Sequence, residues 1–201
     1  MEHKPLIEAL HRINAVKFGE FTLKSGMKSP IYIDLRVIIS YPDVLKLISQ
    51  AMSELIRESK VQYDILAGIP YTALPIATAL SLHLNKPMIY ARKEVKEYGT
   101  KKKIEGAYAA GQTCLVIDDL ITTGDSKFET IAPFEQDGLK ITDIVVLIDR
   151  EQGGKKKLHD NGYALHSVLT LSEIVDHLVQ NGTINKDLER SIRDFLAHHH
   201  V

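Results

Sequence analysis

Residues 113 to 126 read TCLVIDDLITTGDS, and the interpretation of the whole chain starts from this stretch. The four apolar residues 114–117 are too few for a helix and predict a strand that is buried on both faces. Two carboxylates, Asp118 and Asp119, follow this strand, and a Thr-Thr-Gly turn then leads into a helical pattern at Ser126. Ligands of parallel α/β sheets lie beyond the carboxyl ends of the strands, so we expect a binding site here.

The turn and the carboxylates suit two parts of one ligand. A Thr/Gly loop at the start of a helix offers backbone N–H groups and the positive end of the helix dipole, which suit a phosphate. Neighbouring carboxylates accept hydrogen bonds from hydroxyl groups. Either dipeptide alone would be an ordinary strand end or turn, but together they predict a site for a phosphorylated ribose. A nucleotide P-loop is excluded, because no Gly-Lys-Ser/Thr follows the glycine.

The composition is that of a globular protein without a strong overall charge. Hydrophobic residues make up 44% and charged residues 25% of the chain, and the net charge of −1 gives no general attraction to nucleic acid or membranes. The single cysteine, Cys114, excludes an internal disulfide, and its apolar surroundings predict a buried thiol. No signal peptide and no run of membrane-spanning length is present, so we expect a cytoplasmic protein.

Strand and helix patterns alternate along most of the 201 residues. This alternation predicts an α/β fold with a central, mostly parallel five-stranded sheet flanked by helices, with strands at 63–69, 88–91, 114–117, 141–148 and 163–169. Residues 18 to 36, FGEFTLKSGMKSPIYIDLR, instead carry two short strand candidates around turn residues and predict a small hood. We therefore expect an N-terminal helix and hood at 1–40 and a core with C-terminal helices at 41–201, forming one structural unit.

Three local patterns make specific predictions. Pro133 falls inside the helix expected at 126–136, so we expect a kink or an early end there. The spacing from Thr170 to Glu173 is that of a capping box and predicts the start of a helix. The lysines at 155–157 are interpreted as a loop.

The segment 91–108, ARKEVKEYGTKKKIEGAY, is rich in basic residues and poor in apolar periodicity. One interpretation is a solvated loop, which we favour for residues 101–103. The other is a mobile cationic loop that closes over a leaving diphosphate, which we favour for Arg92, Lys93 and Lys96. A charge pair at 4 Å gains about 1 kcal/mol in water and about 4 kcal/mol at an effective dielectric near 20, so closure strengthens such contacts.

VIDDLITTGDS resembles the 5-phosphoribosyl-1-diphosphate (PRPP) signature of type I phosphoribosyltransferases. The resemblance implies that Asp118 and Asp119 bind the ribose hydroxyls and that the loop wraps the 5-phosphate. The implied PRPP contacts in this stretch are Asp118, Asp119, Leu120, Ile121, Thr122, Thr123, Gly124, Asp125 and Ser126. A carboxylate facing the phosphate would oppose binding, so we expect Asp125 to turn outward.

RKEVKEYG resembles the flexible catalytic loop of orotate phosphoribosyltransferases. The resemblance implies a mobile loop at 93–107 that reaches the neighbouring site of a homodimer. It implies diphosphate contacts from Arg92, Lys93, Lys96 and Tyr98, with Lys96 as the main catalytic cation. Tyr98 stands where many bacterial members have histidine, and a phenol is rarely cationic.

Three further segments resemble the same family. FTLKSGMKSPIYID is similar to its hood, which implies that Lys24 contacts both substrates and that Tyr32 and Ile33 line the orotate pocket with Thr122. GIPYTALPIA is similar to a loop that contacts the diphosphate, here through Tyr71 and Thr72, although bacterial members have lysine in place of Thr72. LIDREQGG is similar to the strand end whose arginine, here Arg150, pairs with the orotate carboxylate. The two departures from the bacterial pattern, Thr72 and Tyr98, are shared with the phosphoribosyltransferase half of bifunctional UMP synthases.

The resemblance implies the conversion of orotate and PRPP to orotidine 5′-monophosphate and diphosphate in pyrimidine biosynthesis. It implies Mg²⁺ that is carried by PRPP without direct protein ligands, and an association with orotidine-monophosphate decarboxylase. One alternative is a phosphoribosyltransferase for a purine base, which lacks the carboxylate. Another is a PRPP-sensing regulator that binds nucleic acid, which the near-neutral charge and the length of the chain disfavour.

Overall fold

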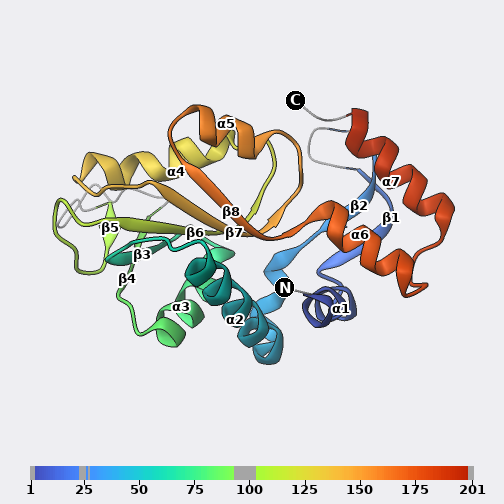
Figure 1. The fold of residues 1–201 in the computed structure, drawn as a ribbon, viewed down its shortest axis with the longest axis horizontal. Coiled ribbons are helices and arrows are strands. Elements are labelled where there is room, and N and C mark those ends of the chain that lie inside the picture. The colour runs from blue at the N-terminus through green and yellow to red at the C-terminus, as the bar shows by residue number, and fades with distance from the viewer. Residues whose placement is uncertain (1–2, 23–25, 27, 93–102, 199–201) are drawn as a thin grey trace.

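The computed structural model describes residues 3–22, 26, 28–92 and 103–198. A six-stranded sheet in the order β5-β4-β3-β6-β7-β8 forms its centre (Figure 1). Five of these strands are parallel, which confirms the predicted α/β fold: β3 (Ile65–Gly68), β4 (Met88–Ala91), β6 (Cys114–Ile121), β7 (Asp143–Asp149) and β8 (Ala164–Thr170).

The sixth strand, β5 (Ile104–Glu105), runs antiparallel to β4 at the edge of the sheet. It lies in the basic segment for which only a loop was expected, so that part of the prediction is wrong. Ile104 is buried, and the Arg92 N–H donates to the Lys103 carbonyl at 2.8 Å. Burial of one isoleucine and pairing with β4 therefore order the end of the segment. Residues 93–102 of the expected mobile loop lie outside the described residues.

Helices cover both faces of the sheet (Figure 1). The helices α2 (Pro42–Glu58) and α3 (Ala73–Leu84) lie on one face, and α4 (Asp125–Gln136) and α5 (Gly154–Asp160) lie on the other. Alternate residues of β6 point to the two faces, because side chains alternate along a strand. Leu115 and Ile117 pack with the core of α2 and α3, whereas Cys114 and Val116 pack with Ile131 of α4. Cys114 is buried as predicted, and burial raises the pKa of its thiol to about 12.

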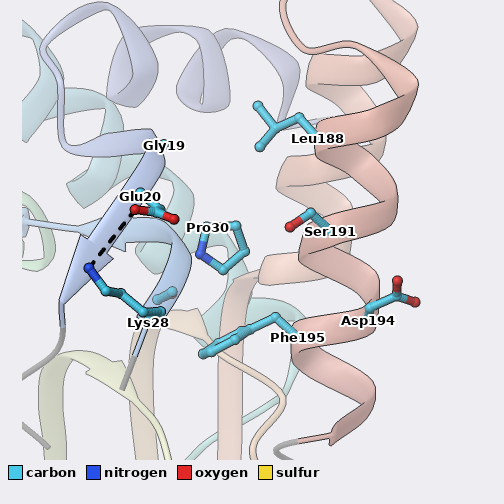
Figure 2. Close-up of a pocket in the computed structure, with 9 residues that line it drawn as sticks. Gly19, Glu20, Lys28, Pro30, Leu188, Ser191, Asp194 and Phe195 are labelled. Carbon is cyan, nitrogen blue, oxygen red and sulfur yellow. Dashed lines mark ion pairs between the residues drawn. The ribbon is translucent and has the colours of Figure 1, made fainter. Parts of the chain in front are cut away.

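The predicted hairpin is present as a separate antiparallel sheet of β1 (Val16–Thr22) and β2 (Lys28–Ile33). The remaining elements are α1 (Lys4–Arg12), the 3-10 helix η1 (Leu35–Ser40), α6 (Leu171–Gln180) and α7 (Lys186–His198). The hairpin and α7 line an open pocket of about 490 Å³, into which Pro30 and Phe195 point from opposite sides (Figure 2). The first and last parts of the chain therefore meet beside the sheet.

One local prediction is confirmed, one is corrected, and of the two alternatives at Pro133 the early end of the helix is excluded. The helix α4 does not end at Pro133 but continues to Gln136, because Ile131 and Phe134 bury against the sheet and offset one missing hydrogen bond. The lysines at 155–157 lie in α5, not in a loop, since Leu158 anchors that helix in the core. The capping box at the start of α6 forms, with Thr170 and Glu173 as partners.

Within the described part of the chain, no helix is both long enough and apolar enough to cross a membrane.

Candidate active site

A cavity of about 430 Å³ opens at the carboxyl ends of β3 and β6, where the parallel sheet predicts a ligand site. It combines two carboxylates, hydroxyl groups and the loop at the start of α4. Its lining residues are Ile69, Pro70, Asp118, Asp119, Leu120, Thr122, Gly124, Ser126, Lys127, Glu129 and Thr130. Six residues of the predicted TCLVIDDLITTGDS site are therefore brought together here.

The two carboxylates lie within β6, which continues four residues further than the sequence pattern predicted. The strand continues because β7 pairs with it as far as Ile121. Asp118 is 5% exposed, and one of its oxygens accepts the N–H of Asp119 at 2.8 Å. Asp119 is partly exposed, and its own Oδ1 accepts the N–H of Leu120 at 2.9 Å.

Two causes make Asp119 easy to protonate. Burial is the larger and the charge of Asp118 the second, and together they raise the pKa of Asp119 to about 7, against a partial opposing effect of Lys127. The site can therefore hold one proton near neutral pH. A ligand that donates hydrogen bonds to both carboxylates favours the ionised pair.

The loop 122–124 joins β6 to α4. Gly124 adopts φ +83°, a conformation that favours glycine, and it caps the start of α4. Thr122 and Gly124 line the cavity, whereas the Thr123 hydroxyl donates to Asp125 at 2.8 Å. Asp125 is exposed and also accepts a hydrogen bond from Lys157 of α5, in agreement with the expected outward orientation. Ile121 is buried in the core.

Gly154, at the start of α5, supports this loop and was missed in the sequence. Its N–H donates to the Thr122 carbonyl at 3.0 Å. A Cβ at this position would lie 2.4 Å from the same carbonyl oxygen, so only glycine allows the contact. The sequence feature that indicates this contact is the Gly153-Gly154 pair at the end of LIDREQGG, directly after Arg150 and the two residues that follow it.

Lys127 is the second residue that sequence reasoning missed. It is 6% exposed, and its ammonium donates to Asp118 Oδ2 and, at 2.8 Å, to the Leu120 carbonyl. A sequence signal was available, since positions 127, 131 and 134 have the spacing of one helix face. That spacing places the lysine on the same buried stripe as Ile131 and Phe134.

Arg150, just after β7, is held close to the same loop. Its backbone N–H donates to the Ile121 carbonyl at 3.0 Å, and burial lowers the pKa of its guanidinium. The Nε atom is buried and has no hydrogen-bond partner among the described residues. Arg150 is not among the residues that line the 430 Å³ cavity, and since buried polar atoms are nearly always hydrogen-bonded, its Nε has capacity for a further acceptor.

Of the other predicted residues, those that the structure describes do not line this cavity. Tyr32 packs on Phe21 and accepts from Arg36 at 3.3 Å, and Arg92 forms an ion pair with Glu105. Tyr71 is 64% exposed, Thr72 directly precedes α3, and Ile33 is half-buried. The remaining predicted contacts lie outside the described residues: Lys24, Lys93, Lys96 and Tyr98.

The fold and this site define a class of protein. The family model of the "Phosphoribosyl transferase domain" matches residues 38–165, more than half of the chain. The chain is thus a phosphoribosyltransferase-domain protein.

Individual relatives narrow the class. An orotate phosphoribosyltransferase of Caenorhabditis elegans is 41% identical over 198 residues, which are 98% of this chain and 86% of the relative. The chain belongs to the orotate phosphoribosyltransferase family. A Bos taurus uridine 5′-monophosphate synthase is 44% identical over 95% of this chain, but this chain spans only 40% of that relative.

Solved structures agree. A UMP synthase of Leishmania donovani superposes with a TM-score of 0.90 at 39% identity, covering 98% of this chain and 43% of that chain. A Mycobacterium tuberculosis orotate phosphoribosyltransferase superposes with a TM-score of 0.75 at 29% identity, covering 87% of this chain and 99% of that chain.

Proposed function

We propose that this protein transfers the 5-phosphoribosyl group of PRPP to orotate, giving orotidine 5′-monophosphate and diphosphate in pyrimidine biosynthesis. The observation that carries the choice of base is the buried Arg150 Nε without a partner, next to the Thr-Thr-Gly loop. A planar guanidinium pairs with a carboxylate in a bidentate manner, and orotate carries such a carboxylate. Purine bases do not.

Each part of the cavity has a role in holding PRPP. Asp118 and Asp119 accept hydrogen bonds from the ribose hydroxyls. The start of α4 binds the 5-phosphate through backbone N–H groups and hydroxyls, with its helix dipole favouring the negative charge. The residues given this role are Leu120, Ile121, Thr122, Thr123, Gly124, Asp125 and Ser126.

Orotate lies between the hairpin and the sheet in this proposal. Arg150 binds its carboxylate, and the remaining contacts come from Lys24, Tyr32, Ile33 and Thr122. Tyr32 has the packing for such a role, because its ring centroid lies 5.4 Å from that of Phe21. A ring held in this way offers a flat apolar surface to a planar base.

The reaction proceeds by departure of diphosphate from C1 of the ribose, with positive charge developing on the sugar. Mg²⁺ carried by PRPP would offset the negative charge of the leaving diphosphate, and we propose no direct protein ligand for it. Further diphosphate contacts come from Tyr71, Thr72, Arg92, Lys93, Lys96 and Tyr98, with Lys96 as the catalytic cation.

The partner proposals follow from the family. We propose a homodimer in which the loop at 93–107 covers the neighbouring subunit's site, and an association with orotidine-monophosphate decarboxylase. The latter is supported by relatives that are longer than this chain, among them the bifunctional enzyme PyrF/PyrE of Nostoc, of which the chain covers 38%.

The test is a panel of bases, with orotate, uracil, adenine and hypoxanthine each incubated with PRPP and Mg²⁺. We expect orotate to be consumed and an equal amount of diphosphate to be released. The absorbance of orotate measures its consumption. The Arg150→Gln variant should lose about 10- to 100-fold in kcat/KM for orotate, the range for a lost charge-assisted hydrogen bond. The matched control is Arg190→Gln, at an exposed position of α7, which should behave as wild type. Consumption of a purine with no effect of Arg150→Gln would overturn the assignment.

A further inference from the structure

Lys127 is an ammonium group inside the protein. Its side chain is 8% exposed, and that of its partner Asp118 is 7% exposed. Most lysines lie at the surface, because removing an ammonium from water is costly unless charges and acceptors replace the water. Here Asp118 supplies the opposite charge, and the Leu120 carbonyl supplies a second acceptor at 2.8 Å.

These contacts tie α4 to the part of β6 that carries the carboxylates. Lys127 comes from the first turn of α4, and it reaches back across the loop 122–124 to residues on either side of Asp119. Asp118 therefore has one oxygen on Lys127 and the other on the N–H of Asp119. The orientation of its carboxylate is set on both sides.

Few other charges act on the pair. From α4, Glu129 also lines the cavity and has the sign that opposes ionisation. From β3 and the turn after it, the lining is apolar. On β7, the carboxylate of Asp149 is used to accept the Glu151 N–H at 2.8 Å. Lys127 is thus the cation among the described lining residues, and it opposes the effects of burial and of Asp118 on Asp119.

We propose that Lys127 is a positioning residue for the sugar site, whose ammonium keeps Asp118 charged and oriented so that both carboxylates accept hydrogen bonds from the ribose hydroxyls. This rests on the proposed binding of PRPP. Lys127 itself touches the carboxylate and not the sugar. Without it, the buried pair holds a proton to higher pH and loses one acceptor for the ribose.

The test measures PRPP affinity between pH 5.5 and 9 by calorimetry, for wild type and Lys127→Met. We expect the variant to bind at least tenfold more weakly at pH 7, and its acid limb to lie about one pH unit higher or more. Affinity should recover in part towards pH 9. Lys127→Arg keeps the charge and should restore most of the wild-type profile. Lys156→Met, which removes an exposed lysine paired with Asp160, is the matched control and should leave the profile unchanged.

A folded Lys127→Met protein with a wild-type pH profile would overturn the proposal, as would failure of Lys127→Arg to restore it. If Lys127→Met does not fold, carboxyl ¹³C titration of wild type labelled at aspartate decides instead. We then expect Asp119 to titrate near neutrality. A second titration near neutrality that Asp118→Asn abolishes would contradict the role of Lys127, and the signal of the buried Asp149 is identified by its loss in Asp149→Asn.

The PRPP affinity measurement tests the role of Lys127 independently of which base the protein uses. The titration uses PRPP without any base, so a protein that binds PRPP but uses another base still tests Lys127. A wild-type protein that shows no PRPP binding at any pH would overturn both the sugar site and the role of Lys127.

Discussion

At Asp119 the requirements of stability and of binding oppose each other. Its pKa of about 7 in the folded protein lies well above the usual aspartate value near 3.8. A raised folded-state pKa means that the folded protein holds the proton more tightly than the unfolded chain. The resulting stability is present in acid and is lost as the pH rises from about 4 to about 7. Above pH 7 the empty site therefore holds an unfavourable charge.

Replacing Asp119 should make this visible. Asp119→Asn removes the charge, so we expect a higher free energy of unfolding at pH 8. The increase should be on the order of a few kcal/mol, the free energy that corresponds to the raised pKa of Asp119. The gain should shrink at pH 5, where wild type is already protonated. Urea denaturation at both pH values measures this. Asp118→Asn should behave in the opposite way and destabilise the protein, because it leaves the buried Lys127 without its counter-charge. An equal gain for Asp119→Asn at both pH values would contradict the explanation.

The negative charge of Asp125 is balanced by neighbouring side chains. It accepts from Thr123 and from Lys157, and these contacts hold its pKa below the usual value. Asp125→Ser should leave the KM for PRPP within about twofold of wild type, since a screened surface pair contributes little. Steady-state kinetics measure this, and a tenfold lower KM would show that the carboxylate faces the phosphate after all.

At the scale of elements, two helix starts and one strand end build the site. The helix α4 begins directly after the loop 122–124, and α5 begins with Gly154 against the Thr122 carbonyl. Arg150 precedes α5 and contacts Ile121 through its backbone. The loop is thus held on one side by β6 and on the other by the segment that carries Arg150. Movement of α5 would disturb the sites for both proposed substrates.

Gly154→Ala tests this arrangement. The added methyl would meet the Thr122 carbonyl oxygen at 2.4 Å and the Ile121 side chain at 2.7 Å, so the loop or α5 has to shift. We expect a loss of roughly 1–3 kcal/mol in the free energy of unfolding, typical of overpacking, together with a higher KM for PRPP. Gly182→Ala is the control, because its φ of +76° strains alanine but nothing lies within 4 Å. It should lose stability without a change in the KM. A wild-type KM for Gly154→Ala would show that α5 does not set the loop.

The whole molecule places the C-terminal helices beside the N-terminal hairpin, so the two ends of the chain form one region next to the sheet (Figure 1). The strands β4 and β5 form the opposite edge of the sheet (Figure 1), and residues 93–102 of the expected loop stand between these two strands in the sequence. A loop from that edge serves a second subunit's site in the proposed homodimer. The dimer then carries two sites, each built from both chains.

Mixed dimers test that proposal. Lys96→Ala should lower turnover much more than PRPP affinity, and Asp119→Asn should be impaired in its own site. Mixing equal amounts of the two variants and letting the subunits exchange should restore up to about a quarter of the wild-type activity. About half of the dimers are then heterodimers, and one of the two sites in each heterodimer has an intact loop and an intact carboxylate pair. Activity assays after mixing, with each variant alone as the control, measure this. No recovery despite exchange of subunits would show that each loop serves its own chain.

Local patterns were enough to predict the parallel strands, the hairpin and the buried Cys114, because burial and hydrogen bonding leave a periodic mark on the sequence. They also indicated the carboxylates and the Thr-Thr-Gly loop, since that chemistry lies on consecutive residues. Tertiary packing was needed for β5, for the continuation of α4 through Pro133 and for the helix at 155–157. In each case contacts with the sheet outweighed the local preference.

Lys127 and Gly154 show the same division within the site. Lys127 has an ordinary helical sequence around it, and only the fold shows that its ammonium is buried against Asp118. Gly154 is distant in sequence from Thr122, and only the close approach of α5 to the loop explains why a glycine is required there. The sequence by itself indicated the carboxylates and the Thr-Thr-Gly loop at the cavity, because these groups are adjacent in the chain. The tertiary structure decided which groups hold them in place, because those contacts join segments that only folding brings together.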